Sequence, residues 1–182
     1  MRHIDLWVGG KPLRDQRTWA YPAGNPGLHY WVPVYELFMR GEDDLGGKVE
    51  VRFDVLRFGV YCKTAGATAH VVGLAEFQVH DIQRWIPTYS VHSATSTEDG
   101  AWQVYGDFLI HDGPDDGTEI FATIGCIEIM GKSGFVKFNE ALITLAGIKG
   151  ATTAAKLADI GSARGITITY EKATRPALRR AK

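Results

Sequence analysis

The sequence predicts a mostly β protein, a β-sandwich or barrel, with one or two short helices after residue 130. Three observations support this prediction. Aromatic residues make up 11% of the 182-residue chain and there are 21 glycines, a composition typical of strands joined by tight turns. Short strand-like runs between residues 48 and 129 are separated by Gly, Asp and Ser. Clear helical spacing of apolar residues occurs only later, in two segments.

The N-terminal region gives weaker signals than the middle of the chain. Residues 18–33 (TWAYPAGNPGLHYWVP) are rich in proline, glycine and aromatic residues, which predicts an ordered loop pinned by aromatic rings. Residues 36–40 are expected to form a turn of helix. The expected strands are 48–53, 59–62, 70–80 with a bulge at Gly73, 102–110, and 166–171 with its alternating ITITYE pattern.

Two helices are expected after the last of the central strands. The first covers residues 133–146, where four apolar side chains fall at helical spacing: Phe135, Phe138, Leu142 and Leu145. Gly147 follows as a natural stop. A second short helix is expected at residues 152–160, ended by Gly161.

The size and charge of the chain limit the protein class. Residues 1–182 fit a single domain with its own core. With 20 Lys and Arg against 21 Asp and Glu, the net charge of −1 lacks the basic footprint of a nucleic-acid-binding protein. The basic residues within 172–182 are expected to form a frayed tail.

Two further features bear on localisation. The first ten residues lack the apolar core of a signal peptide, and no apolar run reaches the roughly 18 residues that a membrane-spanning helix needs. We therefore expect synthesis in the cytoplasm, without a signal peptide and without a membrane partner.

The chemistry most readily supported by the residues centres on a cysteine and a histidine. Cys126 follows Gly125, and His111 ends the apolar run at 108–110. A cysteine attacks as the thiolate, which needs a nearby base and a group that orients the base. His111 could be the base, Asp112 or a nearby backbone carbonyl could orient it, and Gly125 could leave room for an oxyanion hole. Taken singly, however, each residue also fits a buried core cysteine or a strand-end histidine.

Other sites compete less well with this pair. Cys62, beside Lys63, is a rival nucleophile, but it reads more simply as a buried thiol. No HExxH, CxxC or helical ligand pair is present, and the acidic stretch 112–119 does not follow EF-hand spacing. We therefore expect no metal and no cofactor.

The segments FLIHDG (108–113) and TIGCIEI (123–129) resemble the active-site signature of the L,D-transpeptidase catalytic domain family. In that family a histidine closes one strand, and a glycine, the nucleophilic cysteine and an aliphatic residue follow after a variable loop. The resemblance covers residues 84–146, the motif-bearing catalytic region of the single domain. It is closest to divergent branches, the type VI secretion effectors and phage-associated proteins.

The resemblance implies a substrate and a set of site residues. It implies that Cys126, with His111 as base, forms a thioester with a peptidoglycan stem peptide, which water, a D-amino acid or another stem peptide resolves. The protein would be an L,D-carboxypeptidase or an L,D-transpeptidase or exchange enzyme. The catalytic candidates are thus Cys126 and His111, and the supporting or substrate-binding candidates are Gly125, Asp112, Gly113, His92, Tyr105 and Glu128.

The same resemblance implies a biological setting. An enzyme of these branches would be an exported antibacterial effector, delivered to the periplasm of a target bacterium, with a secretion-system carrier and a possible immunity protein as partners. Ile124 and Glu128 depart from the family pattern, which usually has histidine and arginine there. These departures favour an alternative, a catalytically inactive binding or structural module of a phage or secretion apparatus. A cysteine peptidase or amidase with another substrate is a third reading.

Overall fold

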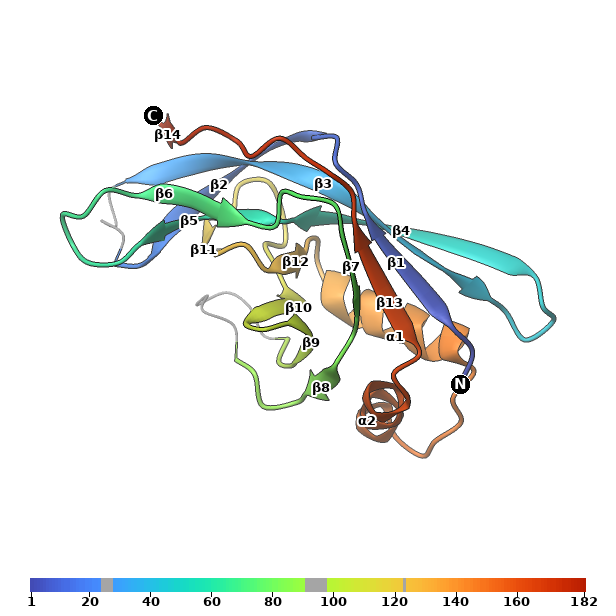
Figure 1. The fold of residues 1–182 in the computed structure, drawn as a ribbon. Helices are drawn as coiled ribbons and strands as arrows, with labels where there is room; N and C mark the ends of the chain where they lie inside the picture. Colours follow the sequence, from blue (N-terminus) through green and yellow to red (C-terminus); the bar gives the residue numbers. More distant parts are fainter. Residues whose placement is uncertain (24–27, 91–97, 123) are drawn as a thin grey trace.

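The computed structural model describes residues 1–23, 28–90, 98–122 and 124–182 (Figure 1). It is 44% strand and 14% helical, which confirms the mostly β prediction and the two short helices after residue 130. The elements are β1 Ile4–Val8, β2 Arg14–Pro22, β3 His29–Glu42, β4 Lys48–Leu56, β5 Phe58–Cys62, β6 His70–Gly73, β7 Gln78–Asp81, β8 Arg84–Ile86, β9 Ala101–Tyr105, β10 Phe108–Asp112, β11 Phe121–Ala122, β12 Ile127–Ile129, α1 Gly134–Ala146, α2 Thr153–Ala163, β13 Ile166–Tyr170 and β14 Arg179–Ala181. No helix in these ranges is long and apolar enough to cross a membrane.

The strands join in one open, mixed sheet with the path β6-β5-β2-β3-β4-β12-β10-β9-β8. The long strand β3 is the centre of this arrangement, because it pairs with β1, β2, β4 and β14. Strand β13 runs parallel to β1 and carries β7 on its other side. The sheet therefore brings β1, from the start of the chain, next to β13, which lies near its end (Figure 1).

Two apolar clusters cover the two faces of β3, because successive side chains point to opposite faces of a strand. Leu37 and Met39 belong to the larger cluster, which includes the buried side chains of α1 and α2. Val32 and Val34 belong to a smaller cluster on the other face, together with Leu56 of β4. In Figure 1 both helices lie on the same side of the sheet. The smaller cluster thus packs on the face away from the helices.

Helix α1 forms where the apolar spacing predicts it. Its four predicted core residues are all buried: Phe135, Phe138, Leu142 and Leu145. It ends at Gly147, which has φ 65°, a left-handed conformation that glycine adopts readily. Helix α2 continues past Gly161, contrary to the prediction. Gly161 lies inside the helix instead of ending it. A glycine is needed at this position because a Cβ there would meet the backbone nitrogen of Trp85 at 2.7 Å.

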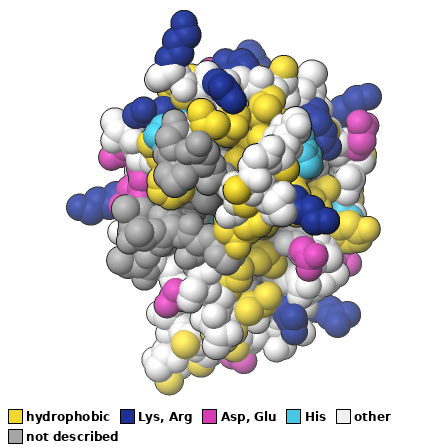
Figure 2. All heavy atoms as spheres, turned by 90° about the vertical axis from the view of Figure 1, so that its left-hand side faces the viewer, with side chains coloured by type: hydrophobic (Ala, Val, Ile, Leu, Met, Phe, Trp, Pro, Cys, Tyr) yellow, Lys and Arg dark blue, Asp and Glu magenta, His cyan; other side chains and the backbone are white. Residues whose placement is uncertain are grey.

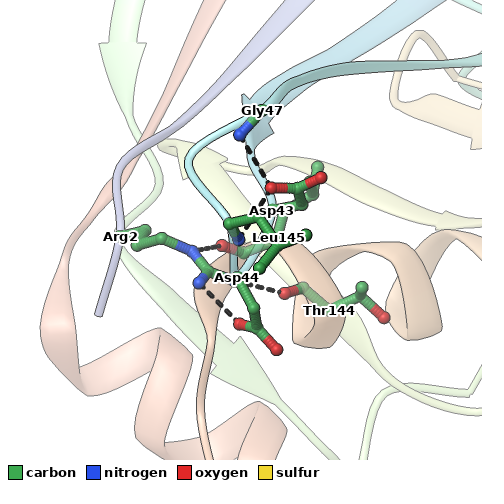
Figure 3. Close-up of polar contacts among 7 residues, drawn as sticks. Arg2, Asp43, Asp44, Gly47, Thr144 and Leu145 are labelled. Carbon is green, nitrogen blue, oxygen red and sulfur yellow. Dashed lines mark hydrogen bonds and ion pairs between the residues drawn. The ribbon is translucent and has the colours of Figure 1, made fainter.

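The C-terminus of α1 is held by Arg2, from the segment before β1 (Figure 3). The Arg2 Nε–H donates to the carbonyl oxygen of Leu145 at 2.8 Å, and Nη2–H donates to that of Thr144 at 2.7 Å. Nη1 forms an ion pair with Asp44, in the turn between β3 and β4, at 2.7 Å. One guanidinium thus joins the chain start, a hairpin turn and a helix end whose carbonyls carry partial negative charge.

Two N-terminal predictions are wrong, because the described residues of both regions lie mostly in strands. Residues 36–40 lie in β3, where Leu37 and Met39 are buried and residues 36, 38 and 40 are more exposed, the alternation of a strand rather than of a helix. Most of residues 18–33 lies in β2 and β3 instead of a loop. In β2, Gln16 and Thr18 are fully buried and their neighbours are not.

Three further predictions need correction. The run 70–80 forms two strands, since β6 ends at Gly73 with φ +133° and β7 begins at Gln78. The run 102–110 forms a hairpin of β9 and β10, which turns at Gly106 with φ +53°. The basic tail is not frayed. Its strand β14 pairs with β3, and Arg179 forms an ion pair with Asp15 at 2.6 Å.

Candidate active site

The two segments of the cysteine–histidine motif lie on neighbouring parallel strands. Strands β10 and β12 pair with Ile110 opposite Ile127 and His111 opposite Glu128. Ile110 and Ile127 point into the larger apolar cluster. Since side chains alternate along a strand, His111 and Glu128 lie side by side on the opposite face. Leu56, which pairs with Glu128 from the other side, belongs to the smaller cluster on that face.

Cys126 immediately precedes β12 and touches β10. Its side chain is only 5% exposed. The backbone N–H of Leu109, two residues before His111, donates a hydrogen bond to the sulfur. The thiol in turn lies 3.9 Å from the carbonyl oxygen of Asp107, in the turn between β9 and β10. The sulfur is therefore held against the strand that carries His111.

His111 is buried and its ring is oriented by the backbone. Its Nδ1–H donates to the carbonyl oxygen of Asp112 at 2.7 Å, so in this tautomer Nε2 carries the basic lone pair. The ring of Tyr89 packs against the imidazole with 5.2 Å between centroids. The orienting group is thus the main chain of Asp112, one of the two possibilities that the sequence offers.

The environment of Cys126 favours the neutral thiol. Its pKa is raised to about 12, mainly by burial and in smaller part by the nearby carboxylates of Glu128 and Asp107, against the opposing hydrogen bond from Leu109. Burial also raises the pKa of Tyr89, with additional contributions from Cys126 and Glu128. Cys126 is therefore protonated in the resting site, and the charge of Glu128 helps to keep it so.

The glycine before the cysteine is needed for packing. Gly125 has φ +93°, and a Cβ on it would lie 2.6 Å from the Cα of Gly73 at the end of β6. The backbone of β6 thus occupies the space that a side chain at 125 would fill, and an oxyanion hole beside Gly125 stays a prediction. Gly113 is similarly close to β12. A Cβ there would lie 2.9 Å from that of Glu128, and its N–H donates to Ile129 at 2.9 Å.

The remaining predicted residues differ in their exposure and in their neighbours. Tyr105 is half exposed at the end of β9 and stacks on His80, with 4.7 Å between ring centroids. Ile124 is 37% exposed. His92 lies outside the described residues. Cys62 is buried in the smaller apolar cluster, and its thiol is 3.3 Å from the carbonyl oxygen of Thr64, as expected for an ordinary core thiol.

The sequence did not single out Tyr89 or Asp107 as part of the site. Both lie in connecting segments, so no periodic pattern marks them, and their contacts depend on how β8, β9 and β10 fold back on one another. Within the ranges that the structure describes, no group of three His, Cys, Asp or Glu side chains could hold a metal ion.

Figure 2 shows the side of the molecule that carries the ends of β2, β5 and β6. Hydrophobic side chains gather near the centre of this face, and Lys and Arg side chains lie around its edge.

Searches against protein-family models, curated proteins and solved structures find no match for this chain.

Proposed function

We propose that this protein is a cysteine-dependent enzyme that modifies peptidoglycan stem peptides through a thioester on Cys126. The observation that supports it best is the β10–β12 pairing, which holds the sulfur of Cys126 against the strand of His111. The orientation of the imidazole by the Asp112 carbonyl supports the same role, because it leaves the basic lone pair on Nε2. The reaction class and substrate follow from the resemblance to the L,D-transpeptidase catalytic domain.

The reaction begins with transfer of the thiol proton to Nε2 of His111. The sulfur forms a bond to the peptide carbonyl carbon, and the carbonyl electron pair moves to the oxygen. When the tetrahedral intermediate collapses, the C–N bond breaks and the imidazolium protonates the leaving amine. Because the pKa of Cys126 is about 12 at rest, the thiolate forms in step with this proton transfer and not as a standing ion.

The resulting thioester can be resolved in two ways. Attack by water gives an L,D-carboxypeptidase, and attack by the amine of a D-amino acid or of another stem peptide gives exchange or cross-linking. Glu128 lies beside His111 in the strand register and would stabilise the imidazolium in either case. In the biological setting that the resemblance implies, the enzyme acts in the periplasm of a target bacterium, with a secretion carrier and an immunity protein as partners.

The test compares the two cysteines of the chain. Wild type, Cys126→Ala and Cys62→Ala are incubated with purified tetrapeptide and pentapeptide muropeptides. The masses of the products and of the intact protein are then measured by mass spectrometry. We expect turnover and an acyl-enzyme mass in wild type and Cys62→Ala, and neither in Cys126→Ala. Turnover of Cys126→Ala equal to that of Cys62→Ala would overturn the proposal.

A second function is supported by the burial of the same cysteine. A thiol of pKa about 12 with a carboxylate nearby is a poor nucleophile unless a substrate changes its surroundings. These properties suit a catalytically inactive binding or structural module of a phage or secretion apparatus. The two functions differ in one measurement: iodoacetamide labelling of Cys126 at neutral pH should rise on addition of stem peptide only in the enzyme.

A further inference from the structure

The hydroxyl of Tyr170, at the end of β13, is a polar group that the fold buries without using. The side chain is only 1% exposed. Its hydroxyl oxygen is buried and makes no hydrogen bond within the part of the chain that the structure describes. Burying a hydroxyl in this way costs free energy, so an unused donor in a core points to a role that the resting state does not show.

A buried positive charge lies against the Tyr170 ring. The guanidinium of Arg57 is 5.6 Å from the ring centroid, and Arg57 is fully buried. Its Nη1 donates to the carbonyl oxygens of Gly9 and Glu171, both at 2.9 Å, and Nη2 donates to that of Leu74. Three segments of the chain therefore fix this cation, and with it the face of the Tyr170 ring.

Two sets of contacts connect this pair with the candidate nucleophile. Leu74, which accepts from Arg57, follows Gly73, and Gly73 packs against Gly125 beside Cys126. On the other side, Tyr170 meets His80 edge to face at 6.4 Å between centroids.

The second set continues through the ring of His80. His80 stacks on Tyr105 at 4.7 Å, and Tyr105 lies two residues before Asp107, whose carbonyl oxygen contacts the Cys126 thiol. Both sets of contacts thus run from the Tyr170–Arg57 pair to residues that lie against Cys126 or beside it in the chain.

The electrostatics of Tyr170 agree with this placement. Burial raises the pKa of its hydroxyl, and the negative charge of an ionised Cys126 raises it further, while Arg57 lowers it by a smaller amount. The hydroxyl therefore keeps its proton when the sulfur becomes an anion, and a protonated phenol beside an anion can act as a donor.

We propose that the Tyr170 hydroxyl donates a hydrogen bond to the Cys126 sulfur when the thiol loses its proton. The thiol proton goes to Nε2 of His111, while Tyr170 keeps its own and only donates. Arg57 acts as a positioning residue that holds the ring. The inference rests on the proposed function, because it needs Cys126 to become anionic during the reaction.

The test measures thiolate formation directly, without turnover. Tyr170→Phe and Tyr35→Phe are each made in a Cys62→Ala background, and the alkylation rate of Cys126 by iodoacetamide is followed from pH 7 to 10. Tyr35 is a matched control because it is equally buried, its ring also lies on Arg57 at 5.4 Å, and the charge that shifts its pKa is that of Arg57. We expect alkylation to fall roughly ten- to hundredfold in Tyr170→Phe and to change less than about twofold in Tyr35→Phe.

A thermal melt separates donation from packing. Since the Tyr170 hydroxyl has no partner within the described residues, its removal should leave the melting temperature unchanged or raise it slightly. Equal alkylation rates in the two variants, or slower alkylation with a lowered melting temperature, would overturn the inference. Neither result would depend on whether stem peptides are turned over, so failure of this inference is distinguishable from failure of the proposed function.

Discussion

The glycine before the candidate nucleophile offers a sharp test of how the site is built. In Gly125→Ala, the new Cβ would lie 2.6 Å from the Cα and 2.8 Å from the nitrogen of Gly73. Both atoms belong to the backbone, so no side chain can rotate away to relieve the contact. The residue also has φ +93°, which an alanine adopts only with strain. Strand β6 or the segment carrying Cys126 must therefore move.

The size of the effect follows from these two costs. A left-handed conformation costs a residue with a Cβ about 1–2 kcal/mol. Overpacking in a filled interior costs about 1–3 kcal/mol more. We therefore expect Gly125→Ala to lower the free energy of unfolding by about 2–5 kcal/mol, which for a chain of this size lowers Tm by roughly 4–20 °C.

The chain contains a matched control for this substitution. Gly106 also has a positive φ, +53°, but a Cβ there meets nothing within 4 Å. Gly106→Ala should therefore show the conformational cost alone, about 1 kcal/mol or 2–4 °C. Both variants are compared with wild type by circular dichroism melts and urea titration. Equal losses in the two variants would refute the view that contact with β6 dictates glycine at 125.

Two other substitutions test the ends of α1 and the charge beside the nucleophile. Arg2→Ala removes two charged hydrogen bonds to the last carbonyls of α1 and should cost about 1–3 kcal/mol in urea titrations. Asp44→Asn should cost far less because that ion pair is exposed, and equal losses would contradict the capping role. Glu128→Gln removes a charge that raises the pKa of Cys126, so that pKa should fall below about 12 and alkylation should become faster at every pH beneath it. An unchanged pH profile of alkylation would show that Glu128 does not act on the thiol.

Elements with one dominant local pattern were predictable from the sequence. Helix α1 is one, because its four spaced apolar side chains bury the face that meets the sheet. Strand β13 is another, because its alternation matches burial on one side. Residues 36–40 were not predictable in this way. Their strand form depends on pairing with β1 and β4, segments distant in the sequence.

The same distinction between local pattern and distant pairing applies to the residues of the candidate site. The motif predicts Cys126 and His111, because both lie in short runs whose order is recognisable. The contacts of Tyr170, Tyr89 and Gly125 depend on where β13, the β8–β9 connection and β6 come to lie. No local sequence pattern encodes these positions. A tyrosine in an alternating strand therefore predicts only a buried core residue.

The parallel pairing of β10 and β12 separates the placing of the candidate pair from the exposed loop that joins the two strands. The pairing of the two strands places His111 relative to the start of β12, which Cys126 directly precedes, and the exposed part of the connection, around Asp115 to Thr118, lies outside this pairing. Residues could be inserted into or removed from the exposed part of this connection, around Asp115 to Thr118, while the register of the strands stays the same. The strand pair that carries Cys126 and His111 and the exposed loop beside it can therefore be engineered as separate parts.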